Sequence, residues 1–242
     1  MNRAIYVIIF GFIFTGLCSC ATERQNEHSS FSGNYNTVEI AYTENIDVAN
    51  QKISIVYPQI SNLKNMDVEQ LLNDSLESLA LEVLEQFTTL DEMEVNVTYT
   101  ITYSTSDILS LYFVANSFHP AQAYPLIRIL AVTFSTRSGE IIDFDKIMDI
   151  NEEFVNSFFD NFQLYSKYDS VEEANVINEY VSGILSREVL SISDEGLNSE
   201  IQGFLTKNSL IISIAVPYSI GSYAFYEAEY SEIKNFLKMD LN

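Results

Sequence analysis

The sequence predicts an α+β fold: an antiparallel sheet packed against one long amphipathic helix, then a helical second half and a C-terminal strand-helix unit. Three observations predict it. Residues 94–104 alternate apolar and polar side chains, which is the period of a half-buried strand. Residues 67–87 carry apolar side chains three to four positions apart, which is the period of a helix. Strand-like segments come first, helix-like segments follow, and a strand returns near the end of the chain.

The first predicted elements are two short strands and the long helix. The strands cover 37–43 and 51–57, and Pro58 ends the second one. Asp67 and Gln70 resemble a capping box at the start of the helix. The apolar stripe that should face the sheet consists of Val68, Leu72, Leu76, Leu79, Val83 and Phe87.

A hairpin and a further strand complete the predicted sheet. Residues 94–104 and 108–118 form the hairpin, joined by a turn at 104–107. Residues 126–135 are apolar on both faces except at Arg128, which indicates a more central strand. Ser138 and Gly139 then predict a turn.

The second half is mainly helical in this prediction. Phe154, Phe158 and Phe162 recur every four residues, and 171–187 has the apolar stripe Ala174, Ile177, Val181 and Ile184. A polar break at 193–199 precedes a strand at 210–216, which Pro217 ends, and a short helix at 231–238. We therefore divide the chain into four parts: 1–19, 20–36, 37–150, and 151–242 packed on the preceding region.

The first twenty residues have the composition of an export signal. Arg3 supplies a positive charge, and residues 4–17 are an uncharged apolar run that is shorter than the about 20 residues needed to span a bilayer. Residues 17–21, Leu-Cys-Ser-Cys-Ala, resemble the lipobox of bacterial lipoproteins, in which a small residue precedes an acylated cysteine. We expect Cys20 to carry membrane lipid and to hold the exported chain on the outer face of a bacterial membrane, or in the periplasm if an outer membrane is present.

A plain signal peptide with two incidental cysteines is the alternative. No cysteine follows Cys20, so neither Cys18 nor Cys20 could form a disulfide with the folded region. The fold must therefore be held by its core. Residues 21–36 are polar and without periodic apolar positions, which predicts a flexible tether between the lipid and the fold.

The chain is strongly acidic, with 34 Asp and Glu against 12 Lys and Arg and a net charge of −22. Phosphate groups would be repelled by such a surface, which excludes nucleic acid as a partner. A negative field favours cationic partners and speeds their association. The alternative reason for the same charge is solubility of an exported protein.

Few residues could carry catalysis, and we expect no metal or cofactor. Zinc needs three or four ligands, whereas the chain has His28 in the tether, His119 and no cysteine in the folded region. His119 is also the only conventional base for a serine nucleophile, and no Gly-x-Ser-x-Gly motif accompanies it. We interpret the loop at 118–125 as a rigid surface turn and His119 as a candidate contact for a partner.

Carboxylates are abundant enough that a hydrolase with an acid and a base remains an alternative. Acidic pairs such as Glu152 with Glu153, however, fall on predicted helices, where charges are usually solvated. Asp143 and Asp145 lack the later ligands of an EF-hand calcium loop, and no glycine-rich phosphate loop is present. The sequence therefore predicts a binding protein and not an enzyme.

Residues 217–226 contain four aromatic side chains in a predicted loop or irregular strand. Tyrosine is enriched at protein interfaces because it brings a large contact area at little entropic cost. We take Tyr218, Tyr223 and Tyr226 as candidate partner contacts. The alternative is that these rings close the edge of the core.

Several motifs, taken in order along roughly residues 50–238, carry a family resemblance. They are Ile-Ser-Ile-Val-Tyr-Pro-Gln-Ile at 53–60, Asp-Ile-Leu-Ser-Leu at 107–111, Phe-His-Pro at 118–120, Thr-Phe-Ser-Thr-Arg-Ser-Gly-Glu-Ile-Ile at 133–142, Phe-Leu-Thr-Lys-Asn-Ser-Leu-Ile-Ile at 204–212, Pro-Tyr at 217–218 and Tyr-Ser-Glu-Ile-Lys at 230–234. Their order resembles the extracellular module shared by RsiV-type anti-sigma factors and PdaC-type peptidoglycan deacetylases.

In that family the module is α+β and non-catalytic, and in the anti-sigma factors it binds lysozyme as a sensor. The resemblance implies an extracytoplasmic ligand-binding module whose partner is lysozyme or another cationic envelope protein. Only residues 1–3 precede the apolar run and nothing follows Asn242, so we expect neither the sigma-binding segment nor the deacetylase domain. A second hypothesis is an accessory module that binds peptidoglycan.

Overall fold

The computed structural model describes residues 35–46, 51–85, 93–165, 171–188 and 201–241. The predicted signal segment, Cys20 and nearly all of the predicted tether lie outside these ranges, as does the predicted polar break at 193–199. Within the ranges, no helix combines the length and the apolar character needed to cross a bilayer.

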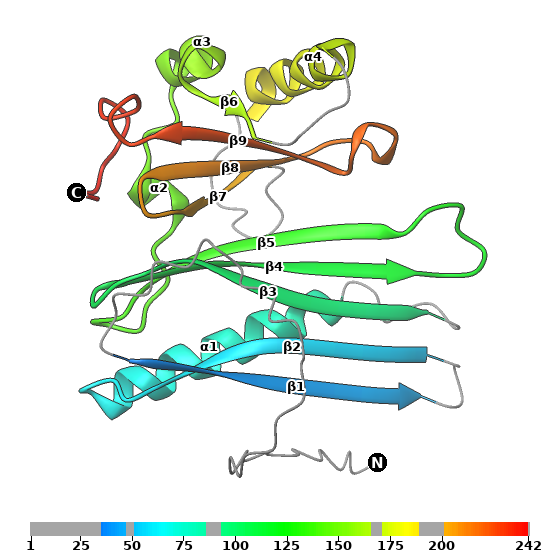
Figure 1. The fold of residues 1–242 in the computed structure, drawn as a ribbon, viewed down its shortest axis with the longest axis vertical. Helices are drawn as coiled ribbons and strands as arrows, with labels where there is room; N and C mark the ends of the chain where they lie inside the picture. The colour runs from blue at the N-terminus through cyan, green and yellow to red at the C-terminus, as the bar shows by residue number, and fades with distance from the viewer. Residues whose placement is uncertain (1–34, 47–50, 86–92, 166–170, 189–200, 242) are drawn as a thin grey trace, which may run out of the picture.

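The first half of the chain forms a five-stranded sheet with strands in sequence order (Figure 1). Its strands are β1 (Asn36–Ile46), β2 (Gln51–Ser61), β3 (Glu94–Ser104), β4 (Ile108–Phe118) and β5 (Leu126–Ser135). The predicted hairpin is confirmed as β3 and β4. The sheet is mixed and not antiparallel throughout, because β2 and β3 are parallel. Helix α1 (Met66–Glu85) makes the crossover that this parallel pair requires.

Helix α1 covers one face of this sheet (Figure 1). Its buried side chains Leu72, Leu76 and Leu79 pack with Ile55 of β2 and Phe113 of β4. The helix begins at Met66, and the residue that bonds its first turn is Asn65, whose Oδ1 accepts the Asp67 N–H at 3.0 Å. The predicted role of Asp67 as the cap is therefore wrong by two residues.

Strand β2 continues through Pro58, where the sequence predicted its end. The Lys52 N–H points to the β3 side of β2 and donates to the chain just before β3. The Ile60 N–H points to the same side and donates to Asn73 Oδ1 of α1. Every second residue of a strand points its N–H group to the same side. Pro58, which has no N–H group, therefore removes a hydrogen-bond donor from the β3 side of the strand only. Pairing with β3 has already stopped at Ile55, and the missing donor costs no ladder hydrogen bond.

The second half forms a four-stranded antiparallel sheet in the order β6-β9-β8-β7, covered by helices at the top of Figure 1. Its elements are α2 (Phe144–Ile147), α3 (Glu152–Asn161), β6 (Gln163–Leu164), α4 (Val171–Glu188), β7 (Ile201–Leu205), β8 (Ser209–Ala215), the 3₁₀ turn η2 (Tyr218–Ile220) and β9 (Tyr223–Glu229). The predicted strand at 210–216 and the helices at 154–162 and 171–187 are confirmed. Because α4 has 18 residues and α1 has 20, the prediction of one long helix was too simple.

The predicted helix at 231–238 is wrong, since this segment forms turns. Its backbone bonds the segment after α2: the Lys238 N–H donates to Ile147 O at 2.9 Å, and the Asp149 N–H donates to Phe236 O at 2.8 Å. These hydrogen bonds require an extended chain. The spacing of apolar residues in this segment instead indicated a helix.

The core of the second half is aromatic. Phe158, fully buried, stacks on Phe162 with ring centroids 4.8 Å apart and meets Phe154 and Tyr226 edge to face. Helix α3 begins where Asn151 Oδ1 accepts the Phe154 N–H at 2.9 Å, as an N-cap does. The four-residue spacing of the phenylalanines therefore marks the buried face of α3 and its C-cap.

The two sheets meet along β5, which is an edge strand and not the central strand that its apolar sequence predicted. Gln202 Oε1 of β7 accepts the Ala131 N–H at 2.7 Å, and Tyr223 Oη of β9 accepts the Ile129 N–H at 3.2 Å. Side chains of the second sheet thus bond donors that an edge strand leaves without a strand partner. This contact also covers residues 129–134 of β5, which are buried or half-buried on both faces, and explains why most of them are apolar.

Candidate functional site

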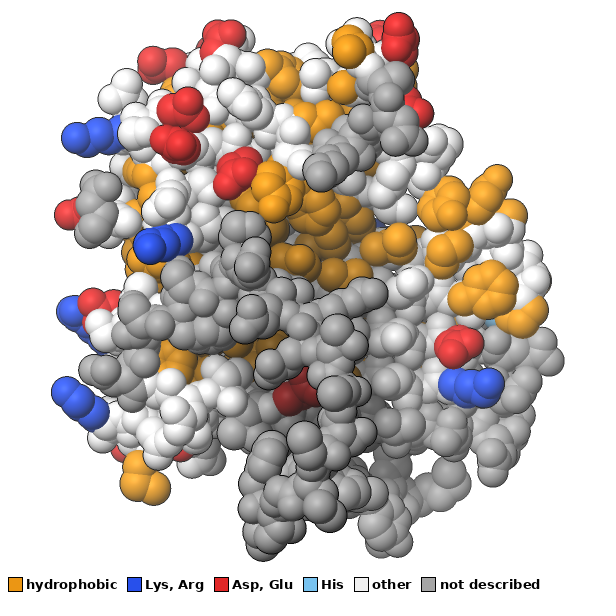
Figure 2. All heavy atoms as spheres, in the orientation of Figure 1, with side chains coloured by type: hydrophobic (Ala, Val, Ile, Leu, Met, Phe, Trp, Pro, Cys, Tyr) orange, Lys and Arg blue, Asp and Glu red, His pale blue; other side chains and the backbone are white. Residues whose placement is uncertain are grey.

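Large apolar side chains are exposed at the end of β4, in the β4–β5 loop and in η2. We call them the loop-end cluster: Phe118 at the end of β4, Tyr124 in the β4–β5 loop, and Tyr218 of η2, which are 45%, 60% and 46% exposed. The Tyr124 and Tyr218 rings stack with centroids 4.4 Å apart and an interplanar angle of 27°. Figure 2 shows the hydrophobic side chains on this side of the molecule, at the right of the view.

Two tight turns hold the cluster. In the β4–β5 loop, His119 Nδ1 accepts the Ala121 N–H at 3.1 Å and His119 O accepts the Gln122 N–H at 2.9 Å. In the other segment, Pro217 O accepts the Ile220 N–H at 2.9 Å. Gly221 then adopts a φ of 117°, a region that glycine enters without the strain of a side chain. His119 thus stabilises the turn that presents Tyr124.

The three predicted tyrosine contacts occupy different environments. Tyr218 is exposed in the loop-end cluster, Tyr223 bonds β5 as described above, and Tyr226 is 1% exposed. The Tyr226 hydroxyl donates to Asn178 Oδ1 of α4 at 2.7 Å, so this ring fills the core between β9 and the helices. The alternative reading of the segment, in which rings close the core, therefore describes Tyr226, while Tyr218 remains available to a partner.

Tyr124 is the member of the cluster that the sequence analysis did not single out. It lies 94 positions before Tyr218, and only the fold shows that the two loops meet. Its position between Pro120 and Pro125, in a loop already noted for His119, was the available signal.

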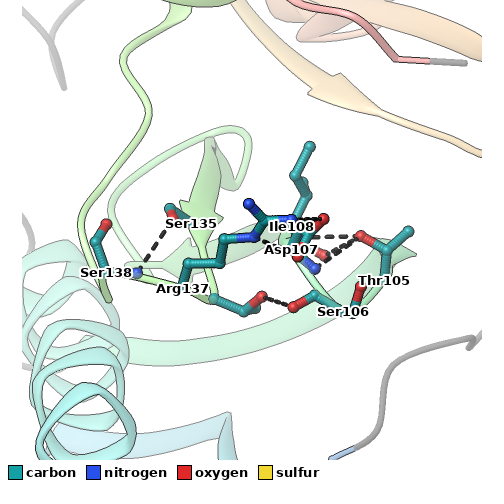
Figure 3. A network of polar contacts seen from close by, with 8 residues as sticks. Thr105, Ser106, Asp107, Ile108, Ser135, Arg137 and Ser138 are labelled. Atoms are coloured by element: carbon teal, nitrogen blue, oxygen red, sulfur yellow. Dashed lines mark hydrogen bonds and ion pairs between the residues drawn. The ribbon is translucent and has the colours of Figure 1, made fainter. Parts of the chain in front are cut away.

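A polar network lies at the turn between β3 and β4 (Figure 3). The Arg137 guanidinium donates to both Asp107 carboxylate oxygens, at 2.6 and 2.7 Å, and this pairing lowers the pKa of Asp107. The Thr136 hydroxyl donates to Ser106 O at 2.7 Å, and the Thr105 hydroxyl accepts the Asp107 N–H. Each polar group is thereby engaged in joining two turns, which is a structural role.

Within the described part of the chain, no three His, Cys, Asp or Glu side chains are grouped so that they could hold a metal ion. Asp143, considered above as a calcium ligand, instead pairs with Lys146 at 2.6 Å. Ser213 of β8 is a separate observation: its hydroxyl is fully buried and has no hydrogen-bond partner. It cannot be reached by a ligand, so this hydroxyl has no part in binding, and its burial without a partner lowers the stability of the fold.

No protein-family model and no curated protein matches the sequence. The fold, in contrast, is similar to crystal structures of DUF3298 family proteins from Pseudomonas aeruginosa PAO1 and Bacteroides fragilis NCTC 9343. The first has a TM-score of 0.52 at 10% identity and covers 87% of this chain and 97% of that chain. The second has a TM-score of 0.51 at 10% identity and covers 86% and 95%. At this identity the likeness concerns the fold.

Proposed function

We propose that this protein is an extracytoplasmic, lipid-anchored module that binds a cationic envelope protein such as lysozyme and catalyses no reaction. The fold similarity to DUF3298 proteins supports the module, because RsiV-type anti-sigma factors and PdaC-type deacetylases contain the same module family. The sequence around Cys20 supports export and lipidation.

The observation that carries the binding proposal is the stacked pair Tyr124 and Tyr218, with Phe118 exposed at the end of β4, the strand that leads into the Tyr124 loop. Exposed aromatic side chains held by rigid turns lose little conformational entropy on binding, which favours their use as interface anchors. The net charge of −22 adds long-range attraction for a basic protein.

The proposal is tested by immobilising the full chain in non-ionic detergent and passing hen egg-white lysozyme over it at low and at physiological salt. Retention that weakens as salt rises is the expected result, because screening reduces the attraction between exposed charges. Lysozyme that passes unretained at both salt concentrations would end the proposal in its lysozyme form.

Two variants locate the contact. Tyr124→Ala and Tyr218→Ala each remove half of the stacked pair, and we expect either to weaken lysozyme binding by about fivefold or more. Tyr165→Ala, at a tyrosine that is 55% exposed in another part of the fold, is the matched control and should bind like the unchanged protein. Equal binding by all three variants would remove the loop-end cluster from the interface.

Peptidoglycan is the second candidate partner, favoured by the sequence resemblance to the deacetylase module. Co-sedimentation of the protein with purified sacculi tests it directly, with the Tyr218→Ala variant as the control for specificity. Protein that stays in the supernatant would remove peptidoglycan and leave the cationic protein as the partner.

The lipid anchor has its own test. Cells fed a labelled fatty acid should yield a labelled protein, and Cys20→Ser should abolish the label and release the protein from the membrane fraction. Retention of the label after Cys20→Ser would place the lipid elsewhere, and absence of the label from the unchanged protein would favour the plain signal peptide.

A further inference from the structure

A second exposed surface lies on α4, at the opposite end of the molecule from β1 (Figure 1). Val176 is 51% exposed and Tyr180 is 38% exposed, although both lie within a helix that buries Ile177, Val181 and Ile184 in the core. Residues four apart on a helix are neighbours on its surface, so Val176 and Tyr180 form one apolar ridge. This ridge faces solvent because the opposite side of α4 already fills the core.

Carboxylates flank the ridge on the same side of α4. Glu172 lies one turn before Val176, and Glu179 lies three residues after it, so both share its face. The neighbouring helix α3 adds Glu152, Glu153 and Asp160 and has no basic residue. Figure 2 shows acidic side chains with hydrophobic ones between them over these two helices.

No ion pair between described residues involves these carboxylates. Ion pairs in the described ranges join Arg137 to Asp107, Lys146 to Asp143 and Lys238 to Asp149. None of the pairs includes Glu152, Glu153, Asp160, Glu172 or Glu179. Their charge is therefore available to attract a cation from outside.

Gly183 lies one turn beyond Glu179 and Tyr180, inside α4. A Cβ at this position would meet no atom within 4 Å, so the packing of the fold does not require glycine there. Glycine also lowers helix stability relative to alanine. A side chain added at this position would therefore point into open space at the end of the apolar ridge.

From the ridge and its carboxylates, we infer that the outer face of α4 docks a basic protein surface, with lysine or arginine side chains on the carboxylates and apolar contact on Val176 and Tyr180. The inference rests on the proposed function and names a second surface for its partner. Charge complementarity selects this occupant: an uncharged partner would have to desolvate carboxylates without pairing them.

The location of α4 agrees with this use. The predicted tether leads into β1, which lies at one end of the long axis in Figure 1, and α3 and α4 lie at the other end. A partner docked on these helices would therefore lie at the end of the fold opposite to β1.

The test measures lysozyme association and dissociation on the immobilised full chain in non-ionic detergent. Glu172→Gln with Glu179→Gln should slow association about threefold or more at low salt, because steering acts on the association rate. Val176→Ala with Tyr180→Ala should speed dissociation about fivefold or more. Alanine favours helix, so the second pair should leave α4 folded.

Matched controls separate the surface from net charge and from helix damage. Asp67→Asn with Asp74→Asn removes the same charge from α1, and Asn175→Ala with Ser182→Ala changes exposed positions on another side of α4; both should bind like the unchanged protein. Gly183→Gln should weaken binding about fivefold or more while its melting temperature stays the same or rises. Lysozyme with succinylated lysines should not bind.

The outcomes divide cleanly. Loss of binding by the α4 variants with unchanged circular dichroism supports the inference. Unchanged binding by the α4 variants, with loss in Tyr124→Ala or Tyr218→Ala, overturns it and leaves the proposed function standing. No binding of lysozyme by the unchanged protein overturns the proposed function and this inference together.

Discussion

The two sheets differ in how their faces are covered. The five-stranded sheet has α1 on one face, while its other face carries exposed side chains such as Thr98, Thr100 and Asn116 beyond the contact with the second sheet. The central strand β8 of the four-stranded sheet has no such exposed side chains. Strand β8 is buried at six consecutive residues, because α3 and α4 cover one side and the first sheet meets the other.

Because of this difference, the stability of the second sheet depends on the first sheet more than the stability of the first depends on the second. A sheet with one wet face can bury its apolar residues against a single helix. A sheet that is apolar on both faces needs two covering layers, and here one of them is supplied by β4 and β5 through Tyr112 and the edge contacts. Loss of the interface between the sheets should therefore affect the second sheet first.

The largest effect is expected in the core of the second half. Phe158→Ala should lower the free energy of unfolding by about 3–5 kcal/mol, because the removed ring contacts four others and leaves a cavity. Urea denaturation followed by circular dichroism measures the change. Phe159→Ala, at a ring that is 41% exposed, is the control and should cost far less; equal losses would contradict the assigned core.

The next effect concerns the packing of β7. A Cβ on Gly203 would lie 2.1 Å from Phe144 Cε2, so Gly203→Ala should displace that ring and cost about 3 kcal/mol. Gly183→Ala is the matched change at an open position and should stabilise the protein by up to about 1 kcal/mol. Thermal melting of both variants should show shifts of opposite sign.

A smaller loss is expected at the edge contact itself. Gln202→Ala removes the acceptor of the Ala131 N–H and should cost about 1–2 kcal/mol, since a partly buried backbone donor loses its partner. Hydrogen exchange by mass spectrometry should report faster exchange in β5 and in β7–β9 than in β3. The same substitution at the exposed Gln163 should leave exchange unchanged. Faster exchange in β3 alone after Gln202→Ala would contradict the proposal that the second sheet depends on the first.

Alkaline pH should act on the first half. Burial, followed by a neighbouring carboxylate, raises the pKa of Tyr57 from 10.0 to about 12, and the same causes raise the pKa of Tyr99 to about 12. The fold therefore favours the neutral phenols, and this contribution is complete below pH 10 and is lost as the pH rises through 12. Tyrosinate absorbance should show both transitions, and Glu77→Gln should lower the pKa of Tyr57; an unmoved Tyr57 transition would exclude the carboxylate as a cause.

The smallest effect should be a gain. Ser213→Ala removes a buried hydroxyl that has no partner and should raise the free energy of unfolding by less than about 1 kcal/mol. Ser110→Ala is the contrasting control, because the Ser110 hydroxyl accepts the Leu205 N–H at 3.0 Å and its loss should destabilise the protein. Destabilisation by Ser213→Ala would indicate a hydrogen bond formed in solution.

The first half was largely predictable because its strands alternate over long stretches. Val95, Val97 and the residues between them give a clear period of two, and their positions in β3 match the prediction. Strand β9 was harder to recognise, since its buried residues include Ala224 and Ala228, whose small side chains give a weak apolar signal. The residues at 231–238 were misassigned because their bonding partners lie near residue 148, far away in the sequence.

The candidate site was predictable only in part, for the same reason. Tyr218 followed from its aromatic segment, and the His119 loop followed from its prolines, but the contact between them depends on how the two sheets meet. The outer face of α4 was visible in the sequence as acidic residues, whereas the exposure of Val176 and Tyr180 required knowledge of which side of the helix is buried.

The side chains that close the edge of β5 also constrain how the protein is made. Gln202 and Tyr223 follow their backbone partners by 71 and 94 positions, so a growing chain completes β5 long before either arrives. During that interval the strand offers open hydrogen-bonding groups to any neighbouring nascent copy. Ribosomes or export machinery that held the unfinished chain apart from its siblings would suppress aggregation, and premature termination before residue 202 would leave a fragment prone to it.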